Sequence, residues 1–471
     1  MSAETYDFAI IGAGSVGLIA ADFAVKLGAR VVLLERDRIG GDCTWSGCVP
    51  SKSLLKVAKV AHEIRTAARF GLHAQSPVVD MLQVRDYLRS TIDQIYKATT
   101  PEAMRQKGMD VILGPVSFID SHTLQVGTSQ IRAKKILIAT GAQPVVPALP
   151  GLSEVAFSTY RDVFERDQLP KRMAVIGGGP VGIELAQAYQ RLGAQVTIFA
   201  EQLLTKEEPD AVAIVQHVLQ REGVHLVRAR ALNVAPSEAG VLVRSAEQEV
   251  ACDLLLVAAG RQPTLDGLNL EAAGITYGAD GIRVGDHLRT TAANVYAAGD
   301  VVGGEQFSHL AGWQGFQAAR NALLPGNHAG LPEVMARVTF TDPELAQAGL
   351  TEAQARAAHG DDVAVLSWPI NRVDRAVCDD DREGMIKIIT RRDGEILGAT
   401  IVAVRAGEAI MEIVMAIRHK IKVADLAGAI HAYPTYNSGI QFMATEMAFE
   451  NATKGFSGTI LRAASKLTSS F

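Results

Sequence analysis

Residues Tyr6–Glu35, which read YDFAIIGAGSVGLIAADFAVKLGARVVLLE, contain the pattern that decides the fold. A short apolar run enters the motif GAGSVG, whose glycines are Gly12, Gly14 and Gly17. An Ala-rich segment follows, and a second apolar run ends at Glu35. This order predicts a buried strand, a glycine turn, a helix and a second strand.

The spacing of the three glycines suits the binding of a dinucleotide. The first glycine permits a tight turn, the second lets the backbone approach a pyrophosphate, and the third lets helix and strand pack closely. The helix N-terminus then faces the phosphate charge, and the carboxylate of Glu35 is placed to bond ribose hydroxyls. Strand, helix and terminal acid together are far more specific than an isolated glycine motif.

The same unit recurs later in the chain. An apolar run at 173–176 enters GGGPVG, with glycines at Gly177, Gly179 and Gly182, and a helical segment follows. Where the first unit has Glu35, the second has an alanine followed by Glu201. Two such units predict two cofactors, or one cofactor and one nucleotide substrate.

Composition limits the class of protein. The chain has 471 residues, of which 48% are hydrophobic and 21% charged, and its net charge is −5. No block of basic residues favours a nucleic acid partner. Four cysteines are too few for a disulfide-stapled secreted protein. Asp22 and Lys26 interrupt the first apolar segment, so we expect neither a signal peptide nor an integral membrane segment, and a cytoplasmic location.

The order of elements predicts an α/β fold with two Rossmann-like nucleotide-binding domains and a C-terminal α+β domain. After residue 331, alternating strands such as 385–389 mix with amphipathic helices. We expect the first domain at 1–150 with a second part at 285–331, the second domain at 151–284, and the C-terminal domain at 332–471.

A cysteine pair follows the first unit, in GGDCTWSGCVPSK at 40–52. The spacing between Cys43 and Cys48 is not that of a zinc site, and no second Cys/His pair accompanies it. A proline suited to the first helical turn places Cys48 beside a helix N-terminus, where the dipole and Lys52 favour a thiolate. These features indicate a reversible disulfide. We interpret Cys252 and Cys378 as inert buried thiols.

Taken together, these residues resemble the flavoprotein disulfide reductases of the pyridine nucleotide class, which include dihydrolipoamide dehydrogenase, glutathione reductase and mercuric reductase. The resemblance covers essentially the whole chain, and its most specific element is the cysteine motif. Supporting matches are ATG at 139–141, AGRQP at 259–263, AGD at 298–300 and FTDPE at 340–344.

The resemblance implies FAD in the first unit, NADH or NADPH in the second, and a homodimer formed through the C-terminal domain. Electrons would pass from nicotinamide to flavin, then to a Cys43–Cys48 disulfide and on to a small-molecule or protein disulfide. Cys48 would be the thiolate against the flavin and Cys43 the outer thiol. Lys52 would lie near the flavin and pair with Glu184.

The same resemblance implies a full set of cofactor-binding positions. Within this set, Asp300 would bind the flavin ribityl chain. The positions are Gly12, Gly14, Gly17, Glu35, Gly41, Lys52, Val116, Thr140, Gly141, Gly177, Gly179, Gly182, Glu201, Val234, Gly260, Asp300 and Ser308. No metal ligands are expected. The carboxylate of Glu201 favours NADH, because it can bond the ribose 2′-hydroxyl. The positive charge of the nearby Lys206 does not favour NADH.

One part of the family pattern is absent. Most members have a His, oriented by a Glu, that the partner subunit supplies as acid and base for the outer thiol. Here Tyr433 and Ser438 stand at those positions, and His431, two residues early, is interpreted as structural. A tyrosine with a pKa near 10 is a poor proton shuttle at neutral pH, so turnover of ordinary disulfides should be slow.

Two alternatives remain. One is a mercuric or other metal-ion reductase. Mercuric reductases also lack this His, and the stretch 196–209 is similar to theirs. However, no cysteine follows Cys378, and Hg²⁺ requires thiolates. The other alternative is a redox sensor or nucleotide-binding flavoprotein with little turnover. The basic amphipathic tail at 456–467 is interpreted as a dimer-interface or surface helix.

Overall fold

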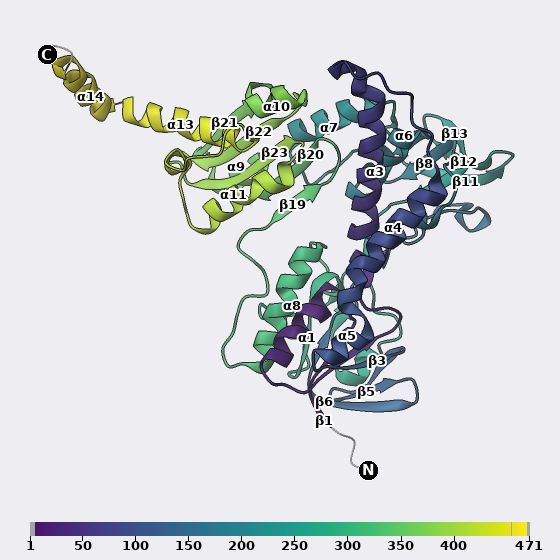
Figure 1. Cartoon of the computed structure of the whole chain (residues 1–471). Helices are drawn as coiled ribbons and strands as arrows, with labels where there is room; N and C mark the ends of the chain where they lie inside the picture. Colours follow the sequence, from purple (N-terminus) through teal and green to yellow (C-terminus); the bar gives the residue numbers. More distant parts are fainter. Residues whose placement is uncertain (1–4, 454, 469–471) are drawn as a thin grey trace. The chain divides into compact units, whose positions relative to one another are not determined.

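The computed structural model describes residues 5–453 and 455–468 (Figure 1). The chain forms two compact units. The first comprises Met1–Glu201 and Val224–Pro332, and the second comprises Gln202–Gly223 and Glu333–Phe471. Both combine helices with β-sheets, as the sequence predicts. The finer division at 150, 284 and 331 stays a prediction.

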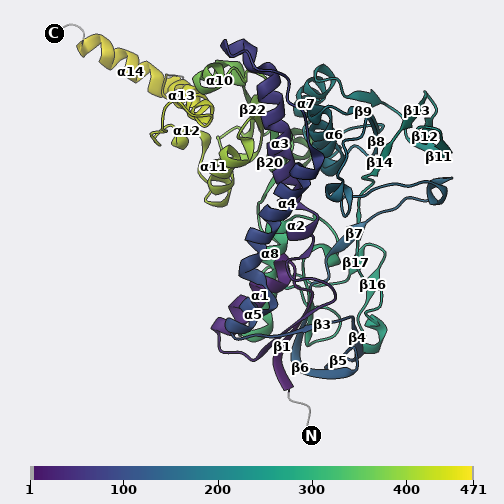
Figure 2. The same cartoon turned by 45° about the vertical axis from the view of Figure 1, so that its right-hand side comes forward.

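The first unit begins with the predicted strand–helix–strand. β1 (Thr5–Ile11) pairs in parallel with β2 (Val31–Glu35), and α1 (Ser15–Lys26) connects them. Phe8, Ala9, Ile10 and Ile11 are all buried, as expected for a strand covered on both faces. α1 packs against α8 (Ser308–Leu323), and the two helices lie side by side in Figures 1 and 2.

The sheet around β1 has the order β3-β2-β1-β6-β5-β4, with β18 paired to β6. β1, β2, β3, β6 and β18 are parallel, so their carboxyl ends meet at one edge. The added strands are β3 (Asp110–Leu113), β4 (Val116–Asp120), β5 (Thr123–Val126), β6 (Ser129–Ile138) and β18 (Val295–Ala297).

The repeat forms a second parallel sheet within the first unit, seen beside α6 in Figure 2. Its order is β10-β9-β8-β14, with α6 (Pro180–Leu192) following β8. The strands are β8 (Arg172–Ile176), β9 (Gln195–Phe199), β10 (His225–Val227) and β14 (Leu254–Val257). An antiparallel sheet of β11 (Ala231–Ser237), β12 (Gly240–Ser245) and β13 (Glu249–Cys252) accompanies it.

The cysteine motif forms the helical part of the first unit. α2 (Gly41–Trp45) carries Cys43, and α3 (Cys48–Thr66) begins at Cys48 itself rather than beside it. α3 packs against α6 and against α4 (Met81–Tyr96), whose N-cap Asp80 accepts hydrogen bonds from the backbone N–H groups of residues 82 and 83. The remaining elements of this unit are α5 (Pro101–Gln106), β7 (Ala142–Pro144), β15 (Arg261–Pro263), β16 (Tyr277–Gly278) and β17 (Gly281–Ile282).

The second unit contains an antiparallel sheet of order β19-β20-β23-β22-β21, whose core side chains include Ile386, Ile388 and Ile401. α7 (Pro209–Arg221) also belongs to this unit, although its sequence lies inside the predicted second nucleotide domain. The strands are β19 (Ala336–Thr339), β20 (Glu344–Gly349), β21 (Val363–Pro369), β22 (Met385–Arg391) and β23 (Ile396–Ala403). The helices are α9 (Glu352–His359), α10 (Asp374–Asp379), α11 (Ala406–Arg418), α12 (Val423–Leu426), α13 (Ser438–Thr453) and α14 (Gly455–Thr468).

Candidate redox site in the first unit

The first glycine turn leaves no room for a side chain at its first and third glycines, Gly12 and Gly17. Gly12 has a φ of +105°, and a Cβ there would lie 2.3 Å from the carbonyl oxygen of Ala139. A Cβ on Gly17 would lie 2.0 Å from the carbonyl oxygen of Gly12, and one on Gly41 would lie 2.7 Å from the Cα of Gly14. The turn therefore has the close approaches that a pyrophosphate-binding loop requires.

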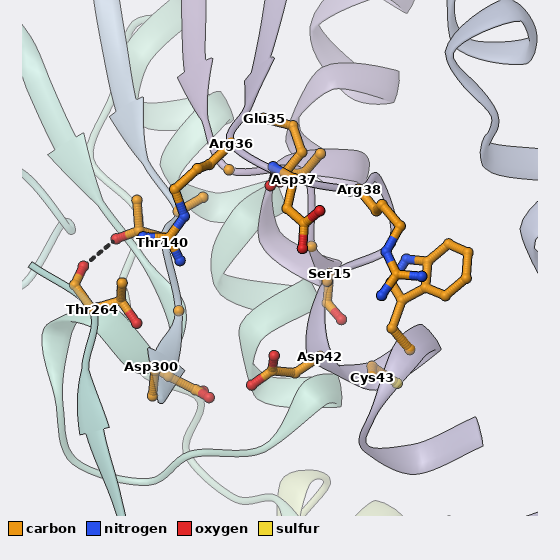
Figure 3. Close-up of a pocket in the computed structure, with 18 of the residues that line it drawn as sticks. Ser15, Glu35, Arg36, Asp37, Arg38, Asp42, Cys43, Thr140, Thr264 and Asp300 are labelled. Carbon is orange, nitrogen blue, oxygen red and sulfur yellow. Dashed lines mark hydrogen bonds between the residues drawn. The ribbon is translucent and has the colours of Figure 1, made fainter. Parts of the chain in front are cut away.

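A cavity of about 1030 Å³ lies at the carboxyl edge of the first sheet (Figure 3). Glu35 lies in its wall, and its carboxylate accepts hydrogen bonds of 2.8 Å from the backbone N–H groups of Ala13 and Asp37. Among the residues predicted to bind cofactor or to react, those that line the cavity are Gly12, Gly14, Glu35, Gly41, Cys43, Cys48, Val116, Thr140, Gly141, Asp300 and Ser308. The glycine turn, the acid and the volume fit a dinucleotide such as FAD.

The two cysteines are free thiols at the wall of this cavity. A hydrogen bond with Cys43 lowers the pKa of Cys48 to about 6, against the opposing effect of burial, and Ser308 and Lys52 add to the lowering. The same bond to Cys48, together with burial, raises the pKa of Cys43. These effects favour the thiolate at Cys48 and the thiol at Cys43.

The predicted Lys52–Glu184 pair is present. Lys52 Nζ on α3 lies 2.7 Å from Glu184 Oε2 on α6. The Glu184 side chain is only 7% exposed, so it is not a solvated helix glutamate. The pair joins the cysteine-bearing helix to the helix that follows the second glycine turn.

A network around Asp42 was not predicted from the sequence. Its carboxylate accepts hydrogen bonds from Tyr160 Oη at 2.9 Å and from Arg261 Nη2 at 3.1 Å. Arg261 also lies 3.0 Å from Asp300, whose carboxylate shares the cavity with Asp42 (Figure 3). Burial raises the pKa of Asp300. The network ties helix α2 to segments more than a hundred residues away in sequence.

The bulky residue between the cysteines packs into the same wall. The Trp45 indole N–H donates to the carbonyl oxygen of Ile39 at 2.8 Å, and the Arg38 guanidinium lies 4.1 Å from the Trp45 ring centroid. Tyr96 contacts the ring edge-on. Trp45 therefore links α2 to α4 and to the loop after β2.

The second glycine turn is crowded at its first and third glycines, as the first turn is. A Cβ on Gly177 would lie 2.2 Å from the carbonyl oxygen of Ala258, and one on Gly182 would lie 2.7 Å from the carbonyl oxygen of Gly177. A Cβ on Gly179 would meet no atom within 4 Å, so this side of the turn is open to a ligand. These contacts suit a second nucleotide.

Three other predicted positions belong to the same part of the first unit. Gly260 has a φ of +118°. Glu201 follows β9, and its carboxylate pairs with Arg230 at 2.7 Å. Val234 lies in β11 with its side chain in the core of this part of the unit, so contact of that side chain with a nucleotide stays a prediction.

The second unit carries Tyr433 and Ser438, which the sequence predicts to stand in place of an acid–base pair. Tyr433 is exposed, and its hydroxyl donates to Asp374 at 2.7 Å, whereas Ser438 is buried. Both nitrogens of His431 are engaged, with Glu412 at 2.8 Å and the carbonyl oxygen of Ala429 at 2.9 Å.

The other two cysteines differ from each other. Cys252 is buried, and burial raises its pKa to about 11, as expected for an inert thiol. Cys378 is exposed, so its interpretation as buried was wrong. Within residues 5–453 and 455–468, no three His, Cys, Asp or Glu side chains gather as a metal site, and no helix is long and apolar enough to cross a membrane.

Comparison with known proteins agrees with this geometry. Residues 6–323 match the family model of pyridine nucleotide-disulphide oxidoreductases, and residues 335–444 match the dimerisation domain of that family. The chain therefore belongs to the pyridine nucleotide-disulphide oxidoreductases, which contain FAD and use NAD(P)H.

Relatives with different activities are similar to the chain. Mercuric reductase from Bacillus cereus is 34% identical over 445 residues, covering 93% of this chain and 70% of the relative. Dihydrolipoyl dehydrogenase from Pseudomonas aeruginosa is 33% identical over 448 residues, covering 92% and 95%. The solved Cu(II) complex of the HOCl-induced flavoprotein disulfide reductase RclA from Escherichia coli has a TM-score of 0.85 at 28% identity, covering 93% of this chain and 99% of that one.

Proposed function

We propose that Cys43 and Cys48 form the redox pair that receives electrons from NAD(P)H and passes them to an acceptor. The observation that carries this proposal is their position: both cysteines line the cavity that contains the glycine turn and Glu35. When bound there, FAD would accept a hydride from NAD(P)H and deliver two electrons to sulfur. The chain's own residues would then divide the charge and the proton between the two cysteines.

The proton balance of the reaction supports placing the negative charge on one cysteine and the proton on the other. A hydride is equivalent to two electrons and one proton, so it converts a Cys43–Cys48 disulfide into one thiolate and one thiol. The hydrogen bond between the sulfurs favours the thiolate at Cys48 and the thiol at Cys43. An acceptor disulfide would then leave as one thiolate and one thiol, with the Cys43–Cys48 bond restored.

Disulfide acceptors face one chemical obstacle. Attack by Cys43 requires loss of its proton, and that pKa is raised. We propose that this chain lacks the family's His/Glu pair, because Tyr433 and Ser438 stand in its place and His431 is engaged with Glu412. Turnover of ordinary disulfides would then be lower by about 10²–10⁴-fold.

A metal-ion acceptor is the second candidate, because it removes this obstacle. A soft cation that binds Cys43 displaces its proton on coordination and needs no base. Reduction of Hg²⁺ to Hg⁰, or of two Cu²⁺ to two Cu⁺, would use the thiolate and thiol, restore the disulfide and release one proton. The mercuric reductase relatives and the Cu(II) complex of RclA favour this candidate. The absence of a second cysteine pair counts against a dedicated mercuric reductase.

The match to a dimerisation domain supports a homodimer. The third candidate, a low-turnover sensor, would use the same cavity and cysteines. It differs from the two enzymes only in kinetics.

Acceptor-dependent oxidation of NAD(P)H tests the proposal. The FAD-loaded protein is offered lipoamide disulfide, oxidised glutathione, Hg²⁺ with excess thiol, and Cu²⁺. Cys43→Ser should abolish oxidation with the preferred acceptor, and Cys378→Ser, which removes an exposed thiol, should not. Equal rates in Cys43→Ser and the wild type would reject the redox pair. Slow stoichiometric reduction with every acceptor would favour the sensor.

A further inference from the structure

Ser308 provides a hydroxyl beside the Cys48 sulfur. It is the first residue of α8, and its Oγ lies 3.3 Å from Cys48 Sγ. The N-cap of α8 is Phe307, and no side chain caps the helix. The Ser308 hydroxyl is therefore not used as a helix cap, and its hydrogen bond is directed at a reacting atom.

Charged groups also face Cys48, but carboxylates offset both cations. Lys52 on α3 is paired with Glu184 on α6, and both act electrostatically on Cys48. Arg261 on β15 interacts electrostatically with Cys48 while contacting Asp42 and Asp300. Glu184 offsets only part of the effect of Lys52, and direct hydrogen bonds to the sulfur stabilise the negative charge further.

The two hydrogen-bonding neighbours of Cys48 differ in one respect. The Cys43 thiol can donate only while it keeps its proton. Once Cys43 bonds to an acceptor, that proton is gone and this donor is lost. The Ser308 hydroxyl takes no part in the exchange and still donates.

We propose that Ser308 is a catalytic residue whose hydroxyl donates to the Cys48 sulfur and holds the negative charge there after Cys43 has given up its proton. This role differs from the cofactor contact expected from the sequence. It rests on the proposed function, because the charge matters only if the two cysteines are the redox pair. Burial opposes the thiolate, and the Ser308 hydroxyl acts in the opposite direction by lowering the pKa of Cys48. The same hydroxyl also lowers the pKa of Cys43, so the 3.3 Å contact with Cys48 Sγ is the observation that assigns it to Cys48.

Three variants separate the effect of the Ser308–Cys48 hydrogen bond from the general effect of removing a hydroxyl group near Cys48. Ser308→Ala removes the donor, and Ser308→Thr keeps it. Ser51→Ala is the matched control, because the Ser51 hydroxyl donates to the backbone carbonyl oxygen of Cys48 at 3.2 Å. If Ser308→Ala does not fold, as judged by FAD content and thermal unfolding, Ser308→Gly replaces it as the variant without a hydroxyl.

The first measurement is the pH dependence of alkylation at Cys48. The FAD-loaded protein is reduced with dithiothreitol, desalted, treated with iodoacetamide over a pH series, and each cysteine is quantified by mass spectrometry. Loss of a charge-assisted hydrogen bond should raise the Cys48 midpoint by about one pH unit, a tenfold loss of thiolate below the midpoint. Ser308→Thr and Ser51→Ala should keep the wild-type midpoint. A Ser308→Ala midpoint equal to that of the wild type would overturn the proposal.

The second measurement separates this inference from the proposed function. The same variants are reduced anaerobically with NAD(P)H, and the long-wavelength charge-transfer band is followed against pH. No band in the wild type would reject coupling of the cysteines to flavin, and the alkylation midpoints would still decide the role of Ser308. A wild-type band whose midpoint is unchanged in Ser308→Ala would reject the role of Ser308 alone.

Discussion

The hydroxyl of Tyr433 donates a 2.7 Å hydrogen bond to the carboxylate of Asp374. This bond raises the pKa of Tyr433, because ionisation would lose the bond and place a phenolate against a carboxylate. Tyr433 is therefore a weaker acid than ordinary tyrosine at neutral pH. Asp374 therefore supplies a carboxylate beside the position at which the sequence predicts that a histidine has been replaced by Tyr433.

That carboxylate makes Tyr433→His an informative substitution. A histidine at 433 could be oriented by Asp374, whereas the buried Ser438 leaves little room for a glutamate. We expect Tyr433→His to raise turnover of lipoamide disulfide by about tenfold or more, since a positioned base contributes about 10²–10⁴-fold. Steady-state NAD(P)H oxidation measures it.

Tyr433→Phe is the matched control and should leave disulfide turnover unchanged, because the phenol is not expected to carry the proton. If Tyr433→His produces no rise while the protein keeps its FAD, loss of the base does not limit disulfide reduction. Such a result would favour the metal-ion candidate.

The ionisation of Cys48 should set the pH dependence of the reduced protein. The pKa of this thiol is lowered to about 6, so the thiolate persists at neutral pH and is lost as the pH falls through about 6. The charge-transfer band should follow the same course. Lys52→Met should raise the midpoint because it removes a positive charge near the sulfur.

Lys56→Met is the control, since Lys56 lies on the same helix and is exposed. Equal midpoints in Lys52→Met and Lys56→Met would show that Lys52 does not stabilise the thiolate.

Nucleotide preference should depend on the Glu201–Arg230 pair. Glu201 favours the 2′-hydroxyl of NADH, and its removal would leave Arg230 to attract the 2′-phosphate of NADPH. We expect Glu201→Ala to raise the ratio of kcat/KM for NADPH to that for NADH by about tenfold, equivalent to about 1.4 kcal/mol. Glu249→Ala removes the carboxylate of a comparable pair with Arg244 and should not change the ratio. An unchanged ratio in Glu201→Ala would contradict the assignment.

The second unit contains a charge cluster built around the buried pair of Lys387 and Glu208. Lys387 on β22 lies 3.0 Å from Glu208, 3.1 Å from Asp210 and 2.8 Å from Glu352. The Lys387 and Glu208 side chains are 7% and 3% exposed. Lys387→Met would leave a buried carboxylate without its cation and should lower the free energy of unfolding by about 3–5 kcal/mol.

Thermal unfolding measures this loss. Lys422→Met, which removes the exposed ion pair with Asp393, should have a much smaller effect. Equal melting temperatures for the Lys387→Met variant and the wild type would show that the cluster does not hold α7 against the sheet.

The sequence predicted the fold because its signals are local. The glycine turns, the strands ending at Ile11 and Glu35, and the helix of the cysteine motif are all specified within short segments, although this helix begins at Cys48 rather than after it. The Lys52–Glu184 pair could also be predicted, but only through the family resemblance. Its residues are far apart in the chain, and nothing near either one points to the other.

What the sequence did not predict is non-local. Asp42 meets Tyr160 and Arg261, and Ser308 meets Cys48, only because folding brings distant segments together. No spacing rule connects such positions. The exposure of Cys378 was missed for the same reason, since burial depends on the tertiary arrangement rather than on the local pattern.

The most direct test of the redox pair is an anaerobic titration of the FAD-loaded protein with NADH and, separately, with NADPH, followed through the visible spectrum. If Cys48 is a thiolate beside oxidised flavin after two electrons, a long-wavelength charge-transfer band appears while flavin absorbance is largely retained, and Cys48→Ser lacks the band. The nucleotide that produces it at lower concentration is the preferred donor. Simple bleaching of the flavin in the wild type, with no such band, would contradict the coupling of these cysteines to the flavin.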